Sequence, residues 1–335
     1  MGAGMRITTN AMIRKYSTNL NKALGDLDAK RNTVSTNRNF NKIAEDPGAA
    51  MKSFKLRSNF ARTDVQIENV KDSLAKFDEV TSNVLNCSKM ARQFIDIDLK
   101  GISGPTSSYE TRQAFKQEVD ELIDSFLQQM NGKYNENFIF GGASTKELPF
   151  EKKGNEIYYR GEPVNTIPDT HKYFSEHSYR DIGFGMKEKD GEIVSTSAFD
   201  TAVNGLDIFG YGTDADGLPN NIVCLAQELS NLLGKEEITG SDAEKYDKII
   251  DKFPDVLHDM IDNGLAALGT KQAFLEKTED QLTQTSQILN EQISNLDFCD
   301  PAEAITNLMW SQYTYNATLK VGNTLLSNSF IDFMS

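Results

Sequence analysis

Long apolar runs are missing from this 335-residue sequence, and hydrophobic residues make up only 39% of it. A membrane-spanning helix needs about 18 consecutive apolar residues, and the longest runs here are only a few residues, so we expect no such helix. The low apolar content favours an elongated, helix-rich protein with narrow seams over a thick core. A net charge of −14 also argues against nucleic-acid binding, because phosphate contacts need a cationic face.

Cysteine and histidine are scarce as well. The cysteines number three, which excludes a framework of paired disulfides, and they share no metal-type spacing: Cys87, Cys224 and Cys299. The histidines also number three, with no cysteine close to them in sequence: His171, His177 and His258. Because metal sites draw on clustered ligands, we expect small buried or half-buried cysteines and surface or turn histidines.

Motifs for catalysis or cofactor binding are absent too. The H-E-x-x-H metalloprotease signature, the G-x-S-x-G elbow and the phosphate-binding Gly-Lys-Ser/Thr string do not occur. Asp214 and Asp216 imitate a calcium loop, but its first ligand would be Gly212 and its twelfth Val223, which lacks a carboxylate. We therefore predict no catalytic, metal or cofactor site, and we expect that the protein is not an enzyme.

Both ends of the chain are predicted to be helical. From Arg6 to Arg38 there are seven Lys or Arg and two Asp or Glu, beside one amphipathic stripe that includes Ile13, Leu20, Leu24 and Leu27. A basic amphipathic segment is compatible with a membrane surface. Its apolar face lacks bulky aromatic residues, however, so packing against partner helices is favoured.

The C-terminal segment has an unusual polar face. From Pro301 to Ser335 only three residues are charged, and amides and hydroxyls replace the charges expected of a solvated helix. Such a helix is expected to be covered by other chains. Its apolar stripe includes Ile305, Leu308, Tyr315, Leu319, Leu326 and Phe333.

Heptad patterns predict the long helices between these ends. One helix, about 47–98, has a 3/4 apolar repeat that includes Val70, Leu74, Phe77 and Val84. A second, about 107–131, follows a Gly- and Pro-rich turn and is expected to begin with a Ser107–Glu110 capping box. A third, about 255–297, repeats leucine every seven residues: Leu268, Leu275, Leu282, Leu289 and Leu296.

Residues 141–219 break this helical pattern. They contain 11 of the 23 Gly and four of the eight Pro, and they predict a strand near 156–160 and a hairpin turn at Asp190-Gly191. The predicted fold is therefore mostly α with a β-rich insert, in which both chain ends build a long antiparallel coiled-coil-like rod. We predict a terminal helical domain (5–45 plus 298–335), a helical rod domain (46–140 plus 220–297) and an outer β domain (141–219).

Several stretches carry a family resemblance. Met5–Asn10 starts the likeness, an Asp-Pro turn follows, and the exit from helix into the β-rich insert is the most specific part: Asp46, Pro47, Phe140, Gly141, Gly142, Pro149 and Phe150. With these motifs the chain resembles the flagellin superfamily from end to end, and within it the hook-associated branch. The entry to the last long helix departs from the family, with Thr270-Lys271 where Ala-Arg is usual.

The resemblance implies a structural component of the bacterial flagellum that joins hook to filament by self-assembly. It implies export without a cleaved signal peptide to an extracellular location. The implied partners are other copies of the chain, the adjacent hook-associated protein, flagellin, and a cytosolic export chaperone on the C-terminal helix. The alternative is a filament flagellin with a small outer domain. An enzyme in the insert lacks any ligand motif, and a generic coiled-coil protein would not explain the Phe140 region.

Overall fold

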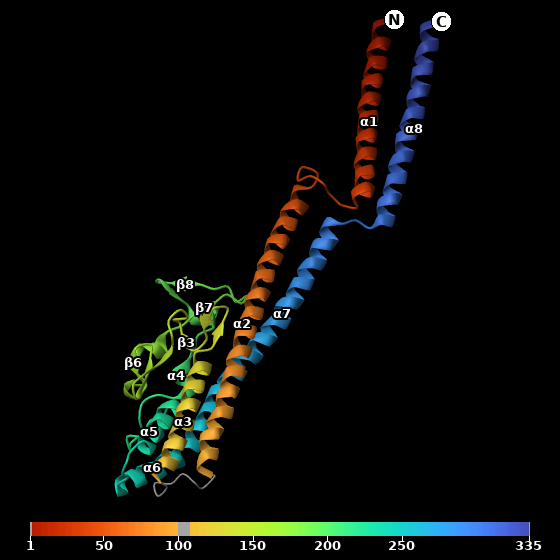
Figure 1. Ribbon diagram of the computed structural model, residues 1–335. Coiled ribbons are helices and arrows are strands. Elements are labelled where there is room, and N and C mark those ends of the chain that lie inside the picture. Colours follow the sequence, from red (N-terminus) through yellow and green to blue (C-terminus); the bar gives the residue numbers. More distant parts are fainter. Residues whose placement is uncertain (1, 100–107, 335) are drawn as a thin grey trace. The chain divides into compact units, whose positions relative to one another are not determined.

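The computed structural model describes residues 2–99 and 108–334, and long helices dominate them (Figure 1). None of the helices in these ranges is long and apolar enough to cross a membrane. The chain divides into a smaller compact unit, Met1–Asp64 with Gln284–Ser335, and a larger one, Val65–Thr283. The predicted class, mostly helical with a β-rich insert, is confirmed. The three-domain division stays a prediction.

The smaller unit is built around a pair of helices from opposite ends of the chain. Helices α1 (Gly2–Thr36) and α8 (Pro301–Met334) lie side by side, with the N- and C-termini at the same end of the pair (Figure 1). Asp300 caps α8 by accepting a hydrogen bond from the Ala302 N–H at 2.8 Å, and Pro301 suits the first helical position because its missing N–H would have no partner there. Asp46 caps α2 through the Ala49 N–H, also at 2.8 Å.

A clasp of hydrogen bonds fixes the segments that lead into and out of this pair. The Asn39 side chain donates to the carbonyl oxygens of Leu296 and Phe298, each at 3.0 Å. Arg38 forms an isolated antiparallel bridge with Phe298, and the Asn39 N–H donates to the Asp297 carbonyl at 2.9 Å. Two connections more than 250 residues apart in sequence are thus held together.

Helices also frame the larger unit. Part of α2 belongs to it, and α6 runs through a π-helical turn into α7: α2 (Pro47–Leu99), α3 (Tyr109–Met130), α5 (Ile222–Leu233), α6 (Gly240–Asp259), η4 (Met260–Leu265) and α7 (Ala266–Asp297). The predicted third helix therefore begins earlier than residue 255. The expected Ser107 cap is wrong: Ser108 is the N-cap and accepts from the Thr111 N–H. Ser107 itself lies outside the described residues.

The β-rich region consists of several small sheets. Instead of one continuous sheet, antiparallel strands form separate sheets of two or three strands. The two-stranded sheets are β1 (Lys133–Tyr134) with β2 (Asn137–Phe138), β3 (Gly141–Gly142) with β11 (Val203–Asn204), β7 (Tyr179–Arg180) with β10 (Phe199–Asp200), and β8 (Glu188–Lys189) with β9 (Glu192–Ile193). The three-stranded sheet is β4 (Phe150–Lys153), β5 (Glu156–Tyr159) and β6 (Glu162–Pro163). The predicted strand is β5. The predicted hairpin is β8–β9, whose turn residues Asp190 and Gly191 both have positive φ, as a type I′ turn requires.

Aromatic side chains form the core of this region, together with the short helix α4 (Gly205–Phe209). The Phe140 and Phe150 rings lie 5.0 and 6.0 Å from the Phe209 ring between centroids, and Tyr159 lies 4.9 Å from Phe150. All four side chains are buried. Gly141 permits this packing because a Cβ there would overlap the Ser144 carbonyl. The motif that exits α3 therefore builds the core between helix and sheets.

Candidate assembly surface on the paired terminal helices

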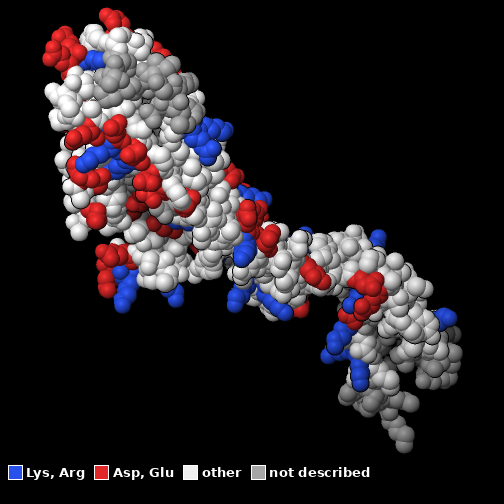
Figure 2. Space-filling view, turned by 90° about the horizontal axis from the view of Figure 1, so that it is seen from below, with Lys and Arg blue, Asp and Glu red and all other residues white. Residues whose placement is uncertain are grey.

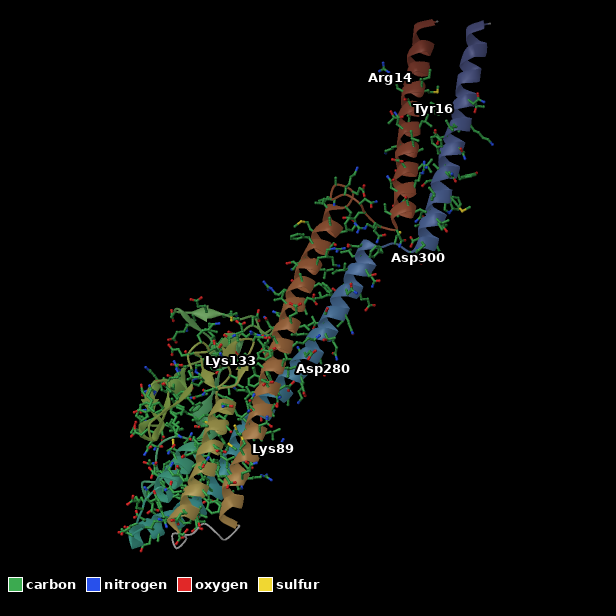
Figure 3. All side chains as sticks on the ribbon, in the orientation of Figure 1. Arg14, Tyr16, Lys89, Lys133, Asp280 and Asp300 are labelled. Carbon is green, nitrogen blue, oxygen red and sulfur yellow. The ribbon has the colours of Figure 1, made fainter. Side chains whose placement is uncertain are left out.

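Small residues and one tyrosine set the contact between α1 and α8. Ala23 and Ala304 are buried. Tyr16 lies between the two helices (Figure 3), and Gly322 of α8 leaves room for its ring, since a Cβ at Gly322 would overlap the tyrosine. Arg14, by contrast, points away from α8 (Figure 3). The Tyr16–Gly322 contact fixes how the two helices are paired along their length.

Large apolar side chains remain exposed on this pair. Trp310 is 65% exposed, Tyr313 69%, Met309 65% and Met12 55%. Met12, Tyr16, Tyr313 and Val321 line a groove of about 470 Å³ along the pair. Isolated apolar side chains are ordinary on a surface, but a gathered patch rimmed by polar residues marks an interaction site. This groove with Met309 and Trp310 is the candidate assembly surface.

The residues that the sequence predicts in the terminal stripes differ in solvent exposure. Leu20, Leu27, Leu308 and Tyr315 are half-buried, whereas Ile13, Leu24, Ile305 and Leu319 are exposed. The side chains of Leu326 and Phe333 lie outside the described residues. The sequence stripe missed Met309, Trp310 and Tyr313, which lie beside it on the helix. Their signal was present: three large apolar side chains on a helix face that carries almost no charge.

The residues expected in the seam differ in burial. Val70, Phe77, Val84, Leu268 and Leu275 are buried, and Leu74, Leu282, Leu289 and Leu296 are half-buried. On α2 the fully buried companion row is Ser73, Val80, Cys87 and Phe94, one residue before the predicted row that starts at Leu74 and repeats every seven residues, in which only Ser88 is buried. The role of the seam in building a rod stays a prediction.

Charge is divided unevenly between the two units. Residues 65–283 hold 39 Asp or Glu and 22 Lys or Arg, whereas the rest of the chain holds 10 and 13. Figure 2 shows acidic side chains gathered over the visible face of the larger unit. The paired terminal helices therefore lack the strong like-charge repulsion that would oppose their association with other copies.

The loop around Asp214, which does not fit a calcium site, holds the ammonium group of a lysine. The Lys252 ammonium of α6 donates to Asp214 Oδ2 at 2.5 Å, to the Leu218 carbonyl at 3.0 Å and to Asn220 Oδ1 at 2.9 Å. Burial opposes ionisation of Asp214, but these charge-assisted bonds outweigh it and lower the pKa of the carboxyl. The oxygen cage thus attaches the loop to α6.

The other candidate groups for chemistry are dispersed. Within residues 2–99 and 108–334, no group of three or more His, Cys, Asp or Glu is placed to hold a metal ion. Cys87 and Cys224 are buried, and burial raises the pKa of both thiols, which makes them unreactive at neutral pH. Each histidine pairs with one carboxylate: His171 with Glu162 at 2.9 Å, His177 with Asp200 at 2.8 Å and His258 with Asp262 at 2.8 Å.

Comparison with known proteins identifies the C-terminal helical segment of the chain. The bacterial flagellin C-terminal helical region matches residues 254–328, which cover the end of α6, the π turn, α7 and most of α8. Flagellin A of Vibrio cholerae serotype O1 is 22% identical over 240 residues, covering 64% of this chain and 63% of that protein. The chain thus spans under two thirds of the length of this relative.

Solved structures identify the fold over about three quarters of the chain. A Vibrio parahaemolyticus protein assigned as flagellar hook-associated superposes with a TM-score of 0.57 at 15% identity, covering 76% of this chain and all of that one. Flagellar hook-associated protein-3 from Legionella pneumophila gives 0.54 at 11% identity, covering 72% and 98%. The chain therefore carries the flagellin C-terminal helical region. Its fold is that of flagellar hook-associated proteins.

Proposed function

We propose that this chain is a structural component of the bacterial flagellum that joins hook to filament by self-assembly. The observation that carries the proposal is the assembly surface on α1 and α8, where Trp310 and Tyr313 are exposed although helix α8 carries almost no charge. Fully burying a large apolar side chain contributes about 1.5–3 kcal/mol, so covering this surface with neighbouring subunits would stabilise an assembly strongly. The fold shared with hook-associated proteins supports the junction role.

The proposal includes the partners and location that such a role needs. Neighbouring copies of the chain would cover the paired terminal helices. The adjacent hook-associated protein would lie on one side of the junction and flagellin on the other, outside the cell. Before export, a cytosolic chaperone would cover the C-terminal helix, whose exposed aromatic residues would otherwise promote aggregation.

Electron microscopy of a deletion strain tests the junction role. We expect hooks without attached filaments, with flagellin lost to the medium. Complementation with the Trp310→Asp/Tyr313→Asp variant should fail to restore filaments, because two carboxylates would have to be buried at the subunit contact. Asn316→Asp is the matched control, since Asn316 is exposed on the same helix. Filaments restored equally by both variants would rule out the assembly surface.

A filament flagellin with a small outer domain is the second candidate, favoured by the flagellin C-terminal match and by the likeness to flagellin A. The same deletion strain separates the two functions. If this chain were the filament subunit, hooks would again lack filaments but no other flagellin would appear in the medium. Shed flagellin supports the junction, and its absence supports the filament subunit.

A further inference from the structure

A polar cavity lies where the β-rich region packs against α2, inside the larger unit. Its volume is about 230 Å³, and its walls come from α2, the β1–β2 hairpin and strand β7, with Lys76, Tyr134, Asn137, Ser178 and Arg180 among the lining residues. Lys133, labelled in Figure 3, begins that hairpin. The hairpin precedes Phe140-Gly141-Gly142, so it lines a cavity while Phe140 builds the core.

The cavity contains a lysine ammonium that forms no ion pair with a carboxylate of the described residues. The Lys76 ammonium donates to the Thr201 carbonyl at 2.7 Å, which is the only protein acceptor that the described residues provide for it. Two of its three hydrogens are therefore available to a ligand. Burial, then the nearby positive charges of Arg180 and Lys271, lower the pKa of Lys76 to about 8, and these effects outweigh the opposing charges of Asp200 and Asp72. An anion beside the ammonium would relieve both effects.

The neighbouring carboxylates are already engaged. Asp72 pairs with Arg180 and accepts the Tyr134 hydroxyl at 3.1 Å. Asp200 accepts the Ser178 N–H at 3.0 Å, the Ala202 N–H at 2.9 Å and His177 at 2.8 Å. Lys271 donates to the Ala202 carbonyl at 3.2 Å. The cavity wall therefore has one positive charge more than its carboxylates neutralise.

From this geometry we propose that the cavity binds a small hydroxylated carboxylate, the size of one uronic acid unit, with its carboxylate on Lys76. One cation without an ion pair matches a monoanion, and Asp72 in the wall disfavours a dianion such as phosphate. The amide of Asn137 and the hydroxyls of Thr145 and Ser178 line the same space and suit ligand hydroxyls. This binding is independent of the junction role, because it uses no residue of the assembly surface.

Titration calorimetry on the full chain with D-glucuronate tests the proposal. We expect saturable binding with a Kd on the order of 1 mM, as the ligand efficiency of a small ligand allows. D-glucose, which has the same size without the charge, should bind at least about tenfold more weakly, the effect of losing one charge-assisted hydrogen bond. Inorganic phosphate should also bind more weakly than glucuronate. Equal or tighter binding of either probe, or no saturation by glucuronate, would overturn the assignment.

Lys76→Met should weaken glucuronate binding by about tenfold or more, whereas Lys71→Met, on an exposed part of the same helix, should leave it unchanged. Should the Lys76 variant fail to fold, lysine NMR on the wild-type chain decides. The pKa of Lys76 should start near 8 and rise when glucuronate saturates the cavity, and affinity should fall as pH rises through that value. If glucuronate leaves the Lys76 resonance unchanged, the proposal is wrong, and the lysine only links α2 to Thr201.

Discussion

At the scale of single residues, Gly322 decides how closely α1 and α8 can approach. Gly322→Ala places a methyl group into the Tyr16 ring, so we expect the smaller unit to lose about 1–3 kcal/mol of stability, as overpacking does. Denaturant unfolding followed by circular dichroism measures this. Adding Tyr16→Ala should recover part of the loss, because the ring is then gone.

Gly25→Ala is the matched control for this substitution. Gly25 lies in α1 with nothing within 4 Å of an added Cβ, and alanine is favoured over glycine in a helix interior by up to about 1 kcal/mol. We therefore expect Gly25→Ala to stabilise the helix slightly. If both alanines had the same effect, the close Tyr16–Gly322 contact would not be what sets the pairing.

Lys252 is a second single residue with a large expected effect. Lys252→Met leaves Asp214 and Asn220 without their shared cation, and we expect a loss of about 1–3 kcal/mol in the free energy of unfolding, below the loss for a fully buried pair because Asp214 is partly exposed. Lys248→Met, one turn away, breaks only the exposed pair with Asp216 and should lose less than about 1 kcal/mol.

The pH dependence of stability gives an independent check on the same cage. Because the pKa of Asp214 is lowered in the folded state, its contribution is present at neutral pH and is lost as pH falls through that lowered value. The Lys252→Met protein should therefore lose less stability than the wild type on acidification below about pH 4. Parallel acid-unfolding curves for the two proteins would contradict this account of the cage.

At the scale of elements, the structure and the heptad count place different residues of α2 in the buried seam. Phe94 is buried and stacks on Phe253 with ring centroids 5.6 Å apart, whereas Ile95, which lies three heptads after Leu74 in the predicted repeat, is only half-buried. Phe94→Ala should destabilise the larger unit by about 3–5 kcal/mol. Ile95→Ala should lower the free energy of unfolding by less than about 2 kcal/mol, because the half-buried Ile95 side chain contributes less buried apolar surface than Phe94 does. Thermal unfolding of both variants tests which residues form the seam. Similar losses of stability in the two variants would contradict the register seen in the structure.

Sequence patterns identified these elements more reliably than their contacts. The long helices, the Asp46-Pro47 turn and the β8–β9 turn were predictable because each depends on local chemistry. The companion row of α2 was not predictable, because Ser73 and Cys87 are buried although neither is a large apolar residue that a periodic pattern selects. The sequence pattern also did not distinguish α5 and α6 from the predicted rod. Trp310 was missed because an apolar stripe selects one face of a helix and gives no information on the residues beside it.

At the scale of the whole molecule, the uneven charge makes self-assembly depend on salt. The segment 65–283 has a formal charge of −17, while the remaining residues have +3. Copies that associate through their terminal helices must bring these acidic segments to a common assembly, where they repel one another. Salt screens that repulsion, with a Debye length of about 10 Å at 0.1 M, and leaves apolar contacts at Met309, Trp310 and Tyr313 intact.

We therefore expect assembly of the purified chain to accelerate as sodium chloride is raised from about 0.02 to 0.5 M, over which the Debye length shortens several-fold. Light scattering measures the rate, and electron microscopy shows whether the product is ordered. The Trp310→Asp/Tyr313→Asp variant should stay unassembled at every salt concentration, which separates assembly through the surface from salting out. Slower assembly at high salt would mean that copies associate through attraction between basic terminal helices and acidic segments, and that apolar burial on α1 and α8 is not the main driving force.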